Sequence, residues 1–160
     1  MLRPDAPEEG WALPDRIKQS IADPNNPLTA RAKKLGIVIK HREHVPNSRR
    51  AHECTEYARA HGKLEPFHHE ILERYWSHGD DLHDWTVLAA AAVKAGLDPA
   101  AMKAEVEAGR WKKAVDEGLE AGAELGINSV PTFIVGNKFA IQGAQDARVF
   151  RQAFERILAS

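Results

Sequence analysis

The first candidate for chemistry is Cys54, the single cysteine of this 160-residue chain. A thiol becomes a good nucleophile when nearby cations or a helix N-terminus lower its pKa. Glu53 and Glu56 would instead keep this thiol neutral, and Arg50 offsets them only in part. One cysteine forms no disulfide within the chain, so dithiol chemistry has no second partner. We predict a buried, inert structural cysteine and no catalytic residue.

The eight histidines suggest metal binding, and His68-His69 is the most suggestive pair. Glu65 and Glu73 each stand four positions from His69, a spacing that brings side chains onto one helix face. No third and fourth ligands follow at a recognisable interval. The cysteine lies two positions from its nearest histidine, so the two would point in different directions on a helix. We predict a solvated, charged face here, with no metal site and no cofactor.

The most informative structural pattern runs from residue 126 to residue 139. Pro131 lacks a backbone N–H, so it suits the entry of a strand better than its middle. An apolar strand follows, and Gly136-Asn137 then tolerates the positive φ of a tight turn. We expect the Val130–Pro131 bond to be cis and to face an open site, since cis bonds occur almost only before proline. The pattern predicts a hairpin over 130–141 and a terminal helix over 146–158.

The residues before this hairpin have a predominantly helical pattern. Apolar side chains recur at helical spacing, and glycines mark where the periodic runs stop. Prolines and asparagines interrupt residues 1–27, where we expect loop and one short helix over 15–21. The apolar run 36–40 is too short to assign. Further helices are predicted over 29–35, 48–61, 64–78, 84–94, from Pro99 onward and over 114–125.

Bulk composition limits the partners of the chain. A net charge of −1 gives no global field that would attract nucleic acid or an anionic membrane. The basic pairs Arg49-Arg50 and Lys112-Lys113 are predicted to be exposed. The sequence contains no run of 18 apolar residues, so no membrane span is predicted. The first residues also lack the apolar stretch of a secretory signal. Together with the single cysteine, this predicts a cytoplasmic protein without nucleic-acid or membrane partners.

Several motifs, in their order along the chain, resemble those of DsbA-like proteins and most closely the FrnE-type dithiol-disulfide isomerases. They are Arg3–Gly10, Leu35-Gly36-Ile37, Val45–His52, Ser129–Phe133 and Gly143-Ala144-Gln145. The resemblance implies an α/β protein with an incomplete thioredoxin-like fold, in which a C-terminal β-hairpin plus helix follows a large inserted helical subdomain. It implies one domain over 1–160, with the helical insertion at 28–126 and the ββα part at 127–160.

The Cys-x-x-Cys that forms the redox centre of that family is missing from this sequence. The family carries it at the start of the first helix, whereas this chain begins at Met1-Leu2-Arg3, past the corresponding point. We therefore expect the opening β-α-β unit to be absent. The resemblance implies thiol-disulfide oxidoreductase activity of the protein disulfide isomerase type, through thiolate attack on a disulfide. The missing cysteines predict that this chain is redox-inactive as it stands.

The resemblance also implies a substrate-binding role for Ser129, Val130 and Pro131, whose backbone can hold an extended polypeptide as an added strand. A first alternative is a non-catalytic thioredoxin-like module that binds polypeptide or associates with another copy of itself. Loss of the first strand would leave an apolar strand edge open for such a copy. A second alternative is a glutathione-dependent enzyme of the kappa transferase or 2-hydroxychromene-2-carboxylate isomerase type. Such enzymes use a serine in place of the cysteine, and that serine would also lie in the missing segment.

Overall fold

The computed structural model describes residues 6–23, 25–40 and 43–159. It divides into two compact units, a first that ends at Glu117 and a second that starts at Gly118. The boundary falls inside helix α7 (Lys112–Glu124), and each unit is described by itself. The subdivision into 28–126 and 127–160 stays a prediction. No helix among the described residues is both long and apolar enough to cross a lipid bilayer.

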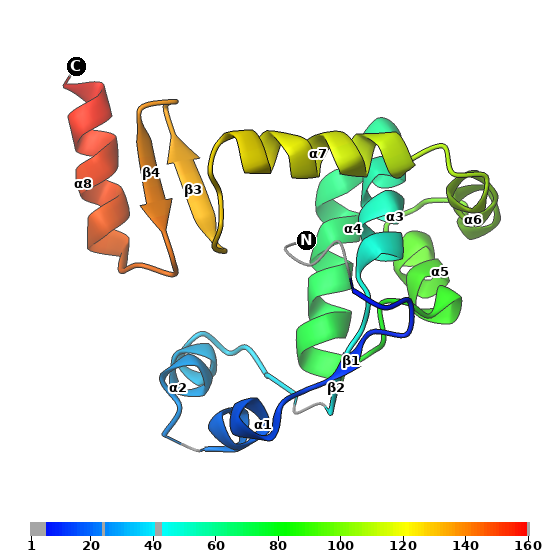
Figure 1. Ribbon diagram of the computed structural model, residues 1–160, viewed down its shortest axis with the longest axis horizontal. Helices are drawn as coiled ribbons and strands as arrows, with labels where there is room; N and C mark the ends of the chain where they lie inside the picture. Colours follow the sequence, from blue (N-terminus) through cyan, green and yellow to red (C-terminus); the bar gives the residue numbers. More distant parts are fainter. Residues whose placement is uncertain (1–5, 24, 41–42, 160) are drawn as a thin grey trace. The chain divides into compact units, whose positions relative to one another are not determined.

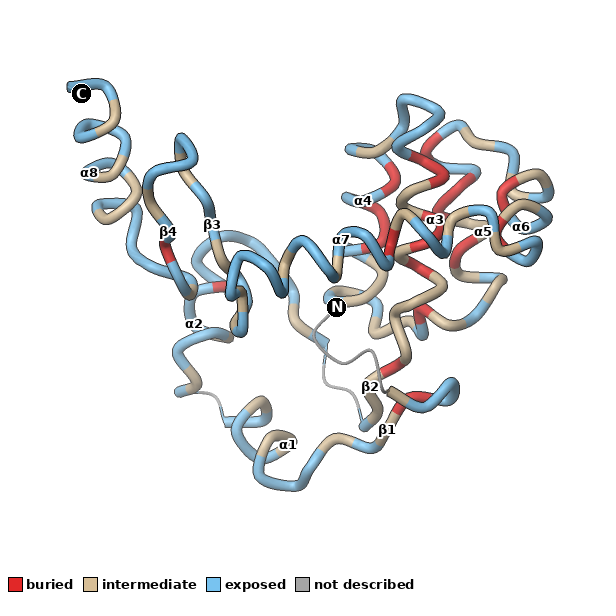
Figure 2. Tube along the Cα trace, turned by 45° about the horizontal axis from the view of Figure 1, so that its top comes forward, coloured by how far each residue is buried: buried red, intermediate tan, exposed pale blue. Residues whose placement is uncertain are grey.

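Four helices hold the core of the first unit (Figure 1): α3 (Arg49–Ala60), α4 (Leu64–Glu73), α5 (Trp85–Lys94) and α6 (Pro99–Glu107). Helix α3 packs on α4 and α6, and α5 packs on the same two helices. Figure 2 shows the buried residues concentrated in this group. Removing one large apolar side chain from water contributes roughly 1.5–3 kcal/mol. The largest fully buried side chains are Phe67, Leu88, Met102 and Cys54.

The starts of these helices follow local capping chemistry. The side chain of Asp84 accepts a hydrogen bond from the Thr86 N–H at 2.8 Å, and Asp98 accepts one from the Ala100 N–H at the same distance. Each carboxylate satisfies a backbone donor that has no partner within the helix. The predicted starts of α5 and α6 are therefore confirmed.

Residues 64–78 are helical throughout, as predicted, but they do not form one α-helix. Helix α4 ends at Glu73, and the chain continues as a π-helix, η1 (Arg74–His78). The Trp76 carbonyl accepts a hydrogen bond from the Lys40 N–H at 2.7 Å, and the Ser77 hydroxyl donates to the Val38 carbonyl at 3.0 Å. The unassigned run 36–40 thus lies beside η1. Apolar periodicity indicated a helix but did not show this change in its hydrogen bonding.

The N-terminal part of the first unit contains two short strands that the sequence did not predict. Strand β1 (Trp11–Ala12) pairs antiparallel with β2 (His44–Val45). Gly10, which precedes β1, has a φ of +77°, and a Cβ there would lie 2.2 Å from the Val45 carbonyl oxygen. Only glycine allows the two segments to approach this closely. Helices α1 (Asp15–Ala22) and α2 (Pro27–Lys34) lie between the strands in sequence, near their predicted positions.

The second unit consists of the end of α7, a hairpin and a final helix. Strands β3 (Thr132–Val135) and β4 (Phe139–Gln142) pair antiparallel, and α8 (Ala147–Leu158) follows. The turn has positive φ at Gly136 and Asn137, 58° and 53°. The ring of Phe133 meets the Phe150 ring of α8 edge-on at 4.9 Å. The predicted C-terminal hairpin and helix are confirmed.

Candidate functional site

The three residues predicted to bind substrate, Ser129, Val130 and Pro131, lie directly before β3. The Val130–Pro131 peptide bond is cis. The Thr132 hydroxyl donates to the Ser129 carbonyl at 2.7 Å, and the Gly143 N–H donates to the Pro131 carbonyl at the same distance. These two bonds fix the carbonyls on either side of Val130. The Val130 side chain is 64% exposed, so the segment presents an apolar side chain on a constrained backbone.

Strand β3 has an open edge, the side opposite β4. Among the described residues, β3 pairs with β4 alone. Its alternating side chains point to the two faces of the hairpin, and both faces remain in part uncovered, since Phe133 is 42% and Ile134 45% exposed. On the Ile134 face, Leu125 and Ile127 help to enclose a cavity of about 220 Å³. The open edge therefore lies beside apolar surface on both faces of the hairpin.

Cys54 lies in α3 and is completely buried, with an exposure of 0%. Burial, and to a smaller extent the Glu53 carboxylate, raise the pKa of its thiol to about 12. A thiol with this pKa is almost entirely protonated near neutral pH, and only the thiolate attacks disulfides. The predicted buried position of this cysteine is confirmed, and its surroundings disfavour nucleophilic chemistry.

The paired histidines lie on the surface of α4. His68 and His69 are both exposed. Across the part of the chain that the structure describes, no three histidine, cysteine, aspartate or glutamate side chains come together in a way that could hold a metal ion. The spacing of Glu65, His69 and Glu73 therefore corresponds to a solvated helix face.

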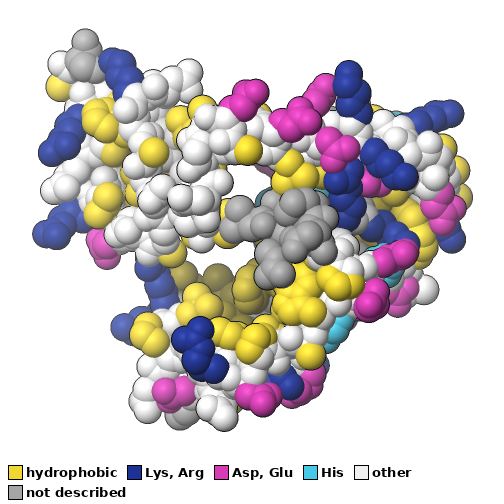
Figure 3. All heavy atoms as spheres, in the orientation of Figure 1, with side chains coloured by type: hydrophobic (Ala, Val, Ile, Leu, Met, Phe, Trp, Pro, Cys, Tyr) yellow, Lys and Arg dark blue, Asp and Glu magenta, His cyan; other side chains and the backbone are white. Residues whose placement is uncertain are grey.

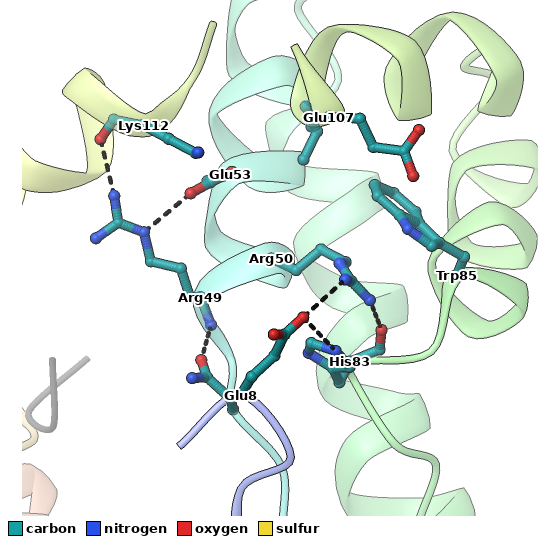
Figure 4. A pocket seen from close by; sticks show the side chains of 10 residues that line it. Glu8, Arg49, Arg50, Glu53, His83, Trp85, Glu107 and Lys112 are labelled. Atoms are coloured by element: carbon teal, nitrogen blue, oxygen red, sulfur yellow. Dashed lines mark hydrogen bonds and ion pairs between the residues drawn. The ribbon is translucent and has the colours of Figure 1, made fainter. Parts of the chain in front are cut away.

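A charged pocket of about 300 Å³ in the first unit was not found by sequence reasoning (Figure 4). The N-terminal segment, the start of α3, the loop before α5 and the start of α7 all contribute to its lining, which includes Glu8, Arg49, Arg50, His83, Trp85 and Lys112. The side chains of Arg49 and Arg50 are only 29% and 24% exposed. The prediction that this basic pair is exposed is wrong, because both side chains turn toward partners distant in sequence.

Comparison with known families decides the relationship of the chain. The family model of the DSBA-like thioredoxin domain matches residues 2–155. The chain belongs to this family. The DsbA-like resemblance is therefore confirmed, whereas the narrower assignment to the FrnE-type isomerases stays a prediction. The sequence has a single cysteine and hence no Cys-x-x-Cys.

A solved structure supports the same fold. The crystal structure of a probable DsbA oxidoreductase from Streptomyces coelicolor matches with a TM-score of 0.84 at 20% sequence identity, and the match covers 99% of this chain and 73% of that chain. At this identity the likeness concerns the fold alone. The chain thus has an α/β, thioredoxin-like fold with an inserted helical region, as predicted. A search of curated proteins found no match.

Proposed function

We propose that this DsbA-like chain belongs to the FrnE-type branch of the thiol-disulfide oxidoreductases. It binds extended polypeptide at Ser129–Pro131 and along the open edge of β3. Residues 1–160 alone carry no dithiol activity, since they contain one cysteine. A cytoplasmic location belongs to the same proposal, because that cysteine forms no internal disulfide.

The observation that carries the binding proposal is the unpaired backbone of Val130 beside the open edge. No described residue hydrogen-bonds to its N–H or C=O. Unpaired strand groups next to exposed apolar side chains are the features that recruit an added strand. The sequence Thr132–Val135 contains no charged residue, so an apolar polypeptide segment would bury no unpaired charge here.

The state of Cys54 supports the absence of dithiol activity. Its pKa of about 12 leaves roughly one thiolate in ten thousand at pH 8. Complete burial also keeps a protein disulfide from reaching the sulfur. Neither attack nor resolution of a mixed disulfide has a suitable group in this chain.

The binding proposal is tested with a labelled insulin B chain whose thiols are reduced and alkylated, so that only non-covalent binding is measured by fluorescence anisotropy. We expect saturable binding, weakened about tenfold or more by Ile134→Lys, because a charged edge disfavours strand addition. Val93→Lys, a matched change at an exposed valine of α5, should leave the affinity unchanged. Equal affinities for the parent and Ile134→Lys, or no binding at all, would overturn the proposal.

The redox proposal has a separate test. The chain is added to insulin and dithiothreitol, and precipitation of the reduced B chain is followed by turbidity. We expect the rate to equal that with dithiothreitol alone, for the parent and for Cys54→Ala. Acceleration by the chain that survives Cys54→Ala contradicts the proposal, as does acceleration abolished by that change.

A further inference from the structure

The charged pocket of the first unit contains two arginines in different states. The guanidinium of Arg49 is fully engaged: it contacts Glu53 at 2.9 Å, Asp116 at 2.6 Å and the Lys112 carbonyl at 3.2 Å. These bonds raise the pKa of Arg49 and lower that of Asp116. Each nitrogen of this guanidinium already has a protein partner, so Arg49 is held as part of the pocket wall.

Arg50 is held firmly but is only partly engaged. Its Nη1 donates to the His83 carbonyl, and its guanidinium lies over the Trp85 ring, 4.9 Å from the centroid. These two contacts fix the direction of the guanidinium. Its Nη2 faces the pocket and lies 3.9 Å from the Glu8 carboxylate. The charge of Arg50 also helps to lower the pKa of Asp84, although backbone and side-chain hydrogen bonds from Thr86 are the larger causes.

Glu8 lies between two nitrogen donors without forming a hydrogen bond to either (Figure 4). The same carboxylate oxygen is 3.9 Å from Arg50 Nη2 and 3.7 Å from His83 Nε2. Both distances exceed that of a hydrogen bond. The Glu8 side chain is also 81% exposed, and exposed ion pairs of this kind contribute little stability. The guanidinium of Arg50 is pre-positioned, whereas the carboxylate opposite it is weakly held.

We propose that this pocket binds a small anion bearing a carboxylate or phosphate group, which displaces Glu8. One oxygen of the anion hydrogen-bonds to Arg50 Nη2 and another contacts His83 Nε2. Lys112 and Glu107 line the same pocket, and the ammonium group of Lys112 offsets the negative charge of the Glu107 carboxylate. Donors that are already oriented favour the incoming anion, since little side-chain entropy is lost on binding. A volume of about 300 Å³ lies at the lower end of the range for small-molecule sites.

The test uses the full chain with succinate and with inorganic phosphate as separate probes, at an ionic strength held constant with sodium chloride. Binding is followed by the NMR shifts of the Trp85 indole N–H and the His83 ring protons. We expect saturable shifts with at least one probe, and the probe that binds identifies the chemical group. Glu8→Gln should tighten binding roughly threefold, because it removes a competing charge. Glu9→Gln, a change at the adjacent exposed glutamate, should have no effect.

Two further variants keep the test decisive. Lys112→Gln and His83→Gln should each weaken binding, and His83→Gln retains the backbone carbonyl that orients Arg50. Urea unfolding of each variant establishes that it is folded. Shifts that do not saturate with either probe overturn the proposal. Equal affinities for the parent and Glu8→Gln overturn it too, because Glu8 then does not occupy the anion position.

Discussion

Burial decides the chemistry of the titratable side chains along α3. Cys54 and His52 lie two residues apart, and burial favours the neutral form of each. The pKa of Cys54 rises to about 12, and the pKa of His52 falls to about 4. Such shifts often mark functional sites. Here the first cause of both shifts is desolvation, in the packed core for Cys54 and at a partly buried position for His52, so they concern stability more than catalysis.

His52 makes stability depend on pH. Its pKa is about 4 in the folded protein and about 6.5 when unfolded, so the unfolded chain binds the proton more readily. The contribution of His52 is complete above pH 6.5 and is lost as the pH falls toward 4. The measurement is urea unfolding at pH 7 and at pH 5. Between these pH values, we expect the free energy of unfolding of His52→Gln to fall by about 1–2 kcal/mol less than that of the parent.

The control for this prediction is His69→Gln, which changes an exposed histidine of the neighbouring helix. It should reproduce the pH dependence of the parent. An identical loss of stability in His52→Gln and the parent would show that His52 is not desolvated in the folded state.

At the scale of elements, helices were readily predicted and short strand contacts were not. Asp84, Asp98 and the glycine stops act within a few residues, so their sequence pattern is sufficient. Strands β1 and β2 have two residues each and lie more than thirty positions apart. Two-residue strands are too short to show an alternating pattern, and their pairing depends on tertiary packing.

Gly10 gives a test of the β1–β2 contact. Gly10→Ala should destabilise the chain by about 2–4 kcal/mol, because both the positive φ and the clash with the Val45 carbonyl oppose a Cβ. Gly62→Ala is the matched control: its φ is +69°, and a Cβ there would meet no atom within 4 Å. This control should lose only about 1 kcal/mol of unfolding free energy, which is the cost of placing a residue with a Cβ at positive φ. Equal losses in urea unfolding would mean that the close approach at Gly10 is unimportant.

At the scale of the whole molecule, the second unit has little core of its own. Ile141 is the one buried residue among residues 118–159. Phe154 and Leu158 of α8 remain exposed, and Figure 3 shows hydrophobic side chains of this helix at the surface among basic side chains. A hairpin with one helix and so small a core is only marginally stable. The unit therefore gains stability from any partner that covers β3.

We predict that a second copy of the chain provides this cover when no other polypeptide is present. The uncharged edge Thr132–Val135 lets two identical strands pair without placing like charges opposite each other. Sedimentation measurements should give a mass that rises with concentration across the micromolar range. Ile134→Lys should restore the monomer, whereas Val93→Lys should not. A monomeric mass at every concentration would contradict the prediction.

The sequence by itself determined the helices, the hairpin with its Gly136-Asn137 turn, and the family to which the chain belongs. The helices and the hairpin depend on caps, turn residues and periodicity, which act over a few positions, and the family is indicated by short motifs in their order along the chain. Only the tertiary structure decided the π-helical end of the second core helix and the pocket formed by Glu8, Arg50, His83 and Lys112. Those features depend on contacts between residues tens of positions apart, which no local pattern encodes.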